Sequence, residues 1–140
     1  MTLTINKSIF LNVPPEKVWP WLTQPEKLAI WFHKPKTALQ ADAPYELFGV
    51  ESGNKVLWGD VLSAQEPNYL EMTFCAGPMG DLVTNVKWWL EPVSGGTRLR
   101  LEHSGIPDTV DAFGLVMAFD KGWDDHIGRM RTGVHETAQS

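Results

Sequence analysis

The chain has 140 residues, of which 43% are hydrophobic and 21% are charged, and its formal net charge is -5. These values are typical of a single globular domain covering residues 1–140, because a chain of this length buries enough surface to fold without disulfides or metals. The acidic charge and the scattered basic residues exclude nucleic acid and an anionic membrane surface as partners, since both are bound by clustered lysine and arginine.

The sequence carries no signal for export or membrane insertion. Cys75 is the single cysteine, so there is no internal disulfide. The N-terminal stretch MTLTINKSIF lacks the basic and apolar regions of a secretory signal. The longest apolar run, Phe113 to Phe119, is too short to span a bilayer. We therefore expect a cytoplasmic protein.

The first elements expected along the chain are a strand and two short helices. Residues 3–12 alternate and are rich in β-branched side chains, which is typical of a strand. Pro15 and Pro25 each suit the first turn of a helix. Pro20 removes a backbone hydrogen bond, so the first helix should be short or bent.

Residues 31–104 are expected to form an antiparallel meander. Turn residues such as those of Ser94-Gly95-Gly96 separate the apolar runs, and short connections favour antiparallel pairing of successive strands. The expected strands are 32–39, 45–51, 54–65, 69–76, 82–92 and 96–104.

The last three strands have one apolar face and one polar face. Every second side chain is apolar, which indicates that one face of the sheet is dry. Trp89 falls on the polar face. Within 54–65 the alternation is ambiguous, and a bulge would reconcile Trp58 with Val61. The apolar rows are Leu70, Met72 and Phe74; Val86, Trp88 and Leu90; and Leu99, Leu101 and His103.

A long C-terminal helix is expected over residues 109–137. Apolar residues recur at spacings of three and four and form a stripe that includes Met117 and Trp123. Gly114, Gly122 and Gly128 weaken the helix, so we expect a bend or break in its first half and a secure helix from about residue 117. One long helix must cover the dry face of the sheet. The expected class is α+β, with a curved antiparallel sheet around this helix.

Three stretches occur in an order shared with a known family. They are PPEKVWPWLTQPEKLAIWF, then Gly59-Asp60-Val61 followed by Glu66-Pro67, and finally LEPVSGGTRLRLEHSG. Together they resemble the SRPBCC (START-like) superfamily, in the branch similar to the activator of the heat-shock-protein-90 ATPase, over residues 5 to 135. The resemblance implies the helix-grip fold of birch-pollen-type allergens and START lipid-transfer domains. It also implies a cavity between sheet and helix that is open to hydrophobic ligands.

The dry side of the sheet is the predicted ligand site. Its side chains would line either a cavity or a filled core, and a pocket usually places a few polar groups among apolar ones. His103 and the indole N–H of Trp88 would supply them. The predicted ligand-binding residues are Trp58, Leu70, Met72, Phe74, Val86, Trp88, Leu90, Leu99, Leu101, His103, Met117 and Trp123.

Two groups of titratable residues are candidates for a binding, catalytic or metal site. His103 could donate to a ligand or act as a base, or it could be a structural histidine bonded to the backbone at the end of a strand. Asp120, Asp124, Asp125 and His126 lack further ligands at helical spacing, which favours a solvated acidic face over a metal site. We expect no cofactor and no metal.

Three functions follow as hypotheses. The leading one is a small binding protein for an apolar or amphipathic molecule such as a lipid, acting as a monomer or homodimer. The second, implied by the resemblance, is a co-chaperone-like module that activates a heat-shock ATPase in a stress response. The third is a cyclase or hydrolase-type enzyme using His103 with an acid such as Asp60, and this one is the least favoured.

Overall fold

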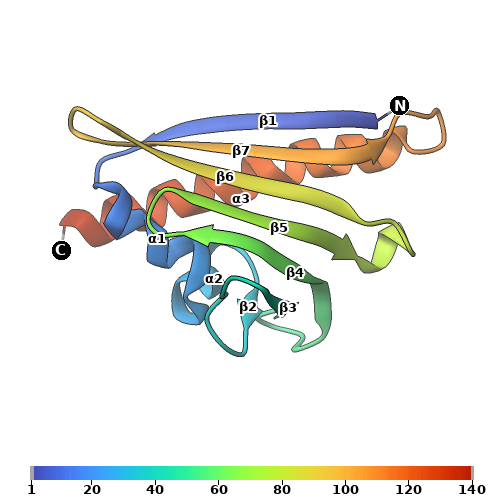
Figure 1. Ribbon diagram of the computed structural model, residues 1–140, viewed down its shortest axis with the longest axis horizontal. Helices are drawn as coiled ribbons and strands as arrows, with labels where there is room; N and C mark the ends of the chain where they lie inside the picture. The colour runs from blue at the N-terminus through green and yellow to red at the C-terminus, as the bar shows by residue number, and fades with distance from the viewer. Residues whose placement is uncertain (1, 140) are drawn as a thin grey trace.

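The computed structural model describes residues 2–139, and it shows a curved antiparallel sheet of seven strands along one long helix (Figure 1). This is the predicted α+β helix-grip architecture, with two short helices after the first strand. The strands are β1 (Thr2–Leu11), β2 (Lys34–Pro35), β3 (Ala43–Phe48), β4 (Lys55–Gln65), β5 (Tyr69–Ala76), β6 (Thr84–Val93) and β7 (Gly96–Pro107). The helices are α1 (Pro15–Thr23), α2 (Pro25–Trp31), the 3-10 turn η1 (Gly77–Met79) and α3 (Phe113–Gln139).

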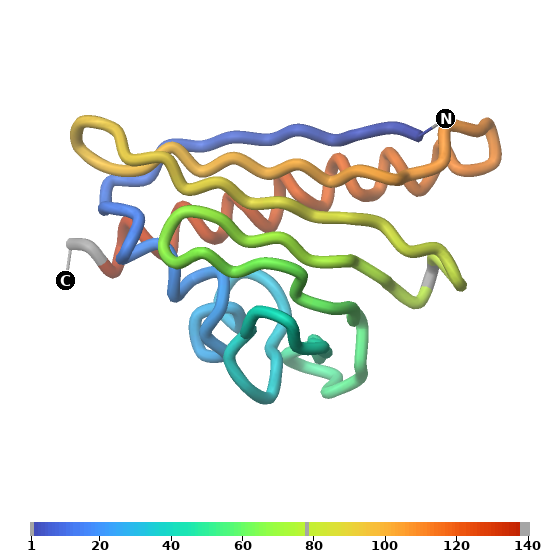
Figure 2. Tube along the Cα trace, viewed as in Figure 1, coloured from blue at the N-terminus to red at the C-terminus, as the bar shows by residue number. Residues whose placement is uncertain are grey.

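The sheet is a meander closed by its first strand. Its order is β1-β7-β6-β5-β4-β3-β2, and all neighbours are antiparallel. Figure 2 shows that β1 and β7 run side by side and that β1 begins at the end of the molecule opposite to the end of α3. The strand expected at 32–39 shrinks to Lys34–Pro35, because a proline cannot donate to the next strand. The residues after Pro35 form a loop instead.

The expected break in the C-terminal helix is wrong, because α3 is continuous from Phe113 to Gln139. A Cβ atom added at Gly114, Gly122 or Gly128 would meet nothing within 4 Å, so these glycines lie on an open surface. Packing of the buried face therefore outweighs their low helix propensity. The buried side chains of α3 are Trp123, Ile127, Met130 and Val134.

A fourth glycine of α3 has a structural role. A Cβ at Gly133 would lie 2.8 Å from the ring of Trp21. Glycine at this position lets α3 approach α1 closely. The helix α1 is short, as expected from the proline within it, and α2 starts directly after it at Pro25.

The dry and wet faces of the sheet are arranged as the alternation predicted. The three apolar rows of β5, β6 and β7 are buried, and one side chain of each row, at Phe74, Trp88 and His103, contacts Trp123 of α3. On the outer face, the Arg100 guanidinium lies 4.7 Å from the ring centre of Trp89, which is a stacking arrangement typical of arginine at a surface. Within residues 2–139 no helix is long and apolar enough to cross a membrane.

Candidate functional site

The space between the sheet and α3 is almost completely filled. The rings of Trp88 and Trp123 meet edge to face with centres 5.7 Å apart, and Phe74 lies 5.9 Å from Trp123. The hollow that remains among these aromatic side chains has a volume of about 20 Å³, which is close to the minimum needed for one water molecule. The predicted lining residues that form this packed interior are Leu70, Met72, Phe74, Val86, Trp88, Leu90, Leu99, Leu101, His103 and Trp123.

His103 is fully buried, at 0% exposure, and both of its ring nitrogens are hydrogen-bonded. The indole N–H of Trp123 donates to Nδ1 over 3.0 Å. An indole nitrogen can only donate, so the imidazole proton must be on Nε2. That proton is donated to Thr84 Oγ1 at 2.8 Å, and the Thr84 hydroxyl donates to the carbonyl of Phe74, also at 2.8 Å.

This chain of hydrogen bonds occupies both ring nitrogens of His103. Burial lowers the pKa of His103 to about 4, so its ring is neutral near pH 7. A neutral imidazole with both nitrogens engaged and no exposed atom is not placed to transfer a proton to a bound molecule. The interpretation as a structural histidine therefore fits this geometry, although its link to the backbone runs through Thr84.

Two predicted site residues lie outside this interior. The side chain of Met117 is 58% exposed. It is on the same face of α3 as Asp120 and Asp124, which turn toward β1 and hold the Lys7 ammonium at 2.7 and 3.0 Å. Met117 thus faces the edge of the sheet and not its concave side.

Among residues 2–139 no cluster of three or more metal-binding side chains is present.

Trp58 lies on the outer face of the sheet. Leu57 and Val61 point inward and are buried, while Trp58 is paired with Cys75 of β5 on the opposite face. A bulge does occur in β4, but the register shifts between Val61 and Ser63. It follows Val61 and therefore cannot turn Trp58 inward.

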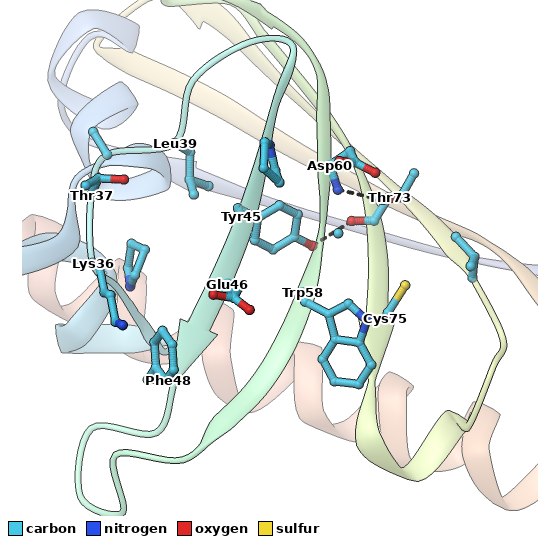
Figure 3. A pocket seen from close by; sticks show the side chains of 15 residues that line it. Lys36, Thr37, Leu39, Tyr45, Glu46, Phe48, Trp58, Asp60, Thr73 and Cys75 are labelled. Atoms are coloured by element: carbon cyan, nitrogen blue, oxygen red, sulfur yellow. Dashed lines mark hydrogen bonds between the residues drawn. The ribbon is translucent and has the colours of Figure 1, made fainter.

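Trp58 instead lines a pocket of about 570 Å³ on the outer side of the sheet (Figure 3). This outer pocket is formed by residues 35–39 and by parts of β3, β4 and β5. Phe48 and Trp58 provide aromatic surface, and Tyr45 lies between the two sides of the pocket. Its charged residues are Lys36, Glu46 and Asp60.

Tyr45, Gly59 and Thr73 lie at the boundary between the outer pocket and the interior. The Tyr45 hydroxyl donates to the Thr73 carbonyl over 2.6 Å, and the Asp60 backbone N–H donates to Thr73 Oγ1 over 2.8 Å. A Cβ at Gly59 would lie 2.4 Å from that same carbonyl, so only glycine fits there. Tyr45 and Leu39 line both the outer pocket and the inner hollow. A single layer of side chains therefore separates the two spaces.

The base of the outer pocket is uncharged. Burial, together with the nearby Cys75 and Asp60, raises the pKa of the Tyr45 hydroxyl. Burial and the Asp60 carboxylate likewise raise the pKa of the Cys75 thiol. Both groups remain protonated near neutral pH, so the base offers hydrogen-bonding groups without charge, and Cys75 is a poor nucleophile.

Most residues of the outer pocket were not predicted as site residues from the sequence. Lys36 lies in the loop that replaces part of an expected strand, and Tyr45 and Phe48 lie in β3, where the alternation of side chains is weak. One signal was present at Gly59, because a glycine inside a strand often marks a close backbone approach. As a site residue, Asp60 was considered only as a possible partner of His103, and the structure places the two on opposite faces of the sheet.

The curved sheet, the long gripping helix and the two short helices define a helix-grip domain of the SRPBCC superfamily. The chain belongs to the family of Activator of Hsp90 ATPase homolog 1-like proteins, whose model matches residues 12–134. No curated protein matches the chain.

Solved structures share the fold over nearly the whole chain. Protein MLL2253 from Mesorhizobium loti is 27% identical with a TM-score of 0.81, and the match covers 96% of this chain and 98% of that one. The Aha1 dimer from Colwellia psychrerythraea, solved in solution, is 19% identical with a TM-score of 0.78, covering 94% and 96%. CalU16 from Micromonospora echinospora is 21% identical with a TM-score of 0.74, covering 95% and 73%.

Proposed function

We propose that this protein binds a small amphipathic molecule in the outer pocket. The observation that carries the proposal is the contrast between the outer pocket, which measures about 570 Å³, and the space between the sheet and α3, which measures about 20 Å³. Pockets for small molecules typically measure about 300–1,000 Å³ and combine apolar walls with a few polar groups. The outer pocket has these properties, whereas a ligand beside α3 would first have to displace packed aromatic rings.

Trp58 is the side chain on which binding in this pocket is expected to depend most. Replacing Trp58 with alanine should weaken the binding of aromatic amphipathic molecules by about tenfold, because the stacking surface is lost. The measurement is a thermal-shift screen for ligands, followed by titration calorimetry on the parent and the variant.

Trp89→Ala is the matched control, because Trp89 is also on the outer face but does not line the pocket. It should leave affinity unchanged. Ligands whose affinity is unaffected by Trp58→Ala would bind elsewhere and would contradict the proposal. A screen without any stabilising ligand would do so as well.

A second candidate function is the activation of a heat-shock ATPase. It is favoured by the family match and by exposed apolar side chains near the start of α3: Val110 at 94%, Phe113 at 58% and Met117 at 58%. Exposed apolar groups of this kind often mark protein contacts.

The protein is expected to stimulate ATP turnover by a purified Hsp90-type chaperone. A double variant with Phe113→Ser and Met117→Ser should lose most of that stimulation. An unchanged turnover rate with the parent protein would remove this candidate.

A further inference from the structure

Two unpaired charges of opposite sign lie on the two sides of the outer pocket. The Lys36 ammonium is 5.2 Å from the ring centre of Phe48, and no carboxylate within residues 2–139 pairs with it. The Asp60 carboxylate likewise has no ion pair in that part of the chain, since its hydrogen bond to Thr73 is made by the backbone. Figure 3 shows Lys36 and Asp60 on opposite sides of the pocket, with Tyr45 between them.

The other charged groups at the pocket compensate one another. The Lys55 ammonium lies 3.4 Å from Glu46 and 5.1 Å from the ring centre of Trp58. Among the pocket residues within the described part of the chain, this leaves Lys36 as the free cation and Asp60 as the free anion. The attraction between a ligand and these charges increases when the ligand displaces water, because water screens charges at a surface.

The surface between the two charges carries aromatic and apolar side chains beside the Glu46–Lys55 ion pair. Trp58 is half-buried and lines the same pocket, as do Pro44 and Leu39. A flat, apolar body fits this surface better than a polar chain does, because it can stack on the indole ring. Charge and shape together thus define three zones along the pocket.

We propose that the outer pocket takes an elongated amphoteric molecule, with an acidic group at Lys36, a flat apolar body on Trp58 and a protonated amine at Asp60. This inference rests on the proposed function of the pocket and adds the class of ligand. It requires that the two ends of the ligand be recognised independently.

The test uses four small probe molecules, each built on a para-substituted benzene ring. They are para-(aminoethyl)benzoate with both charges, para-methylphenethylamine with the amine, para-ethylbenzoate with the acid, and the neutral para-ethylbenzamide. Two exposed ion pairs should together make the amphoteric probe bind about tenfold more tightly than the neutral one in an NMR titration. Added salt should reduce this difference.

Two variants separate the ends of the ligand. Asp60→Asn should weaken the two amine-bearing probes by about three- to fivefold and leave para-ethylbenzoate unchanged. Lys36→Gln should weaken only the two acid-bearing probes. Both residues are exposed, so both variants should fold. Asp111→Asn and Lys17→Gln remove the same charges at exposed positions outside the pocket and should change nothing.

The possible failures of this inference and of the proposed function are distinguishable. Equal affinity for the amphoteric and the neutral probe, with both weakened by Trp58→Ala, would overturn the ligand class and leave the binding pocket standing. Affinities unchanged by Asp60→Asn and Lys36→Gln would do the same. Failure of all four probes to bind would overturn the ligand class. The ligand screen with the parent and Trp58→Ala would then show whether the outer pocket binds any small amphipathic molecule.

Discussion

Replacing Trp123 with alanine is expected to lower the free energy of unfolding by about 4 kcal/mol, the range measured when a large buried aromatic side chain is removed. Trp123 is 3% exposed, and its ring lies within 6 Å of the rings of Phe32, Phe74 and Trp88. Its loss would leave a hollow among these rings. It would also leave Nδ1 of His103 without a donor.

Urea denaturation near neutral pH measures this effect, and two variants provide the comparison. Trp123→Phe keeps an aromatic ring but removes the N–H, so its cost should be smaller, about 1–3 kcal/mol for an unpaired buried acceptor. Trp89→Ala alters only the outer face and should cost less still. The new hollow in Trp123→Ala should bind a small apolar molecule such as benzene. If Trp123→Ala were as stable as Trp89→Ala, the interior would not be packed as described.

Acidification is expected to destabilise the protein well before its carboxylates are protonated. The pKa of His103 is about 4 in the folded state and about 6.5 when unfolded. Between these values the unfolded chain binds a proton that the folded chain does not. The contribution of His103 to stability is therefore full above about pH 6.5 and falls by about 1.4 kcal/mol for each pH unit below it, until about pH 4.

A His103→Gln variant isolates this effect, because glutamine can donate and accept hydrogen bonds but does not titrate. Unfolding free energies measured between about pH 7 and pH 5 should fall less steeply in the variant than in the parent. Some dependence should remain, because burial also lowers the pKa of His126 to about 4 and that of His33. The same slope in both proteins would mean that His103 is not held neutral by burial.

Much of the fold could be predicted because its signals are local. The alternation in β5, β6 and β7 and the turns between them determine which side chains face inward. The continuity of α3 could not be predicted in this way. Helix propensity at Gly114 and Gly122 favours a break, but the packing of Trp123 and Met130 against the sheet outweighs it, and that packing exists only in the folded chain.

The candidate site could be predicted only in part, because its shape depends on distances between elements. Whether the concave side is hollow depends on how closely α3 approaches α1, and Gly133 permits an approach in which Trp21 nearly touches the helix backbone. The hydrogen-bond acceptor for His103 Nε2 is the hydroxyl of Thr84 in the neighbouring strand β6. This role of Thr84 becomes apparent only from the hydrogen bonds in the folded structure. The outer pocket depends on the path of the loop after Pro35, which no periodic pattern encodes.

The double role of Tyr45 has a practical consequence for protein engineering. Tyr45 and Leu39 are shared by the surface recess and the hydrophobic interior. Shortening Tyr45 is expected to join the two into one chamber that is open to solvent and extends toward the concave side, while the aromatic contacts of Trp123 stay in place. An engineer who wants to build a deep binding chamber into this scaffold should therefore begin at β3, and not at the long helix.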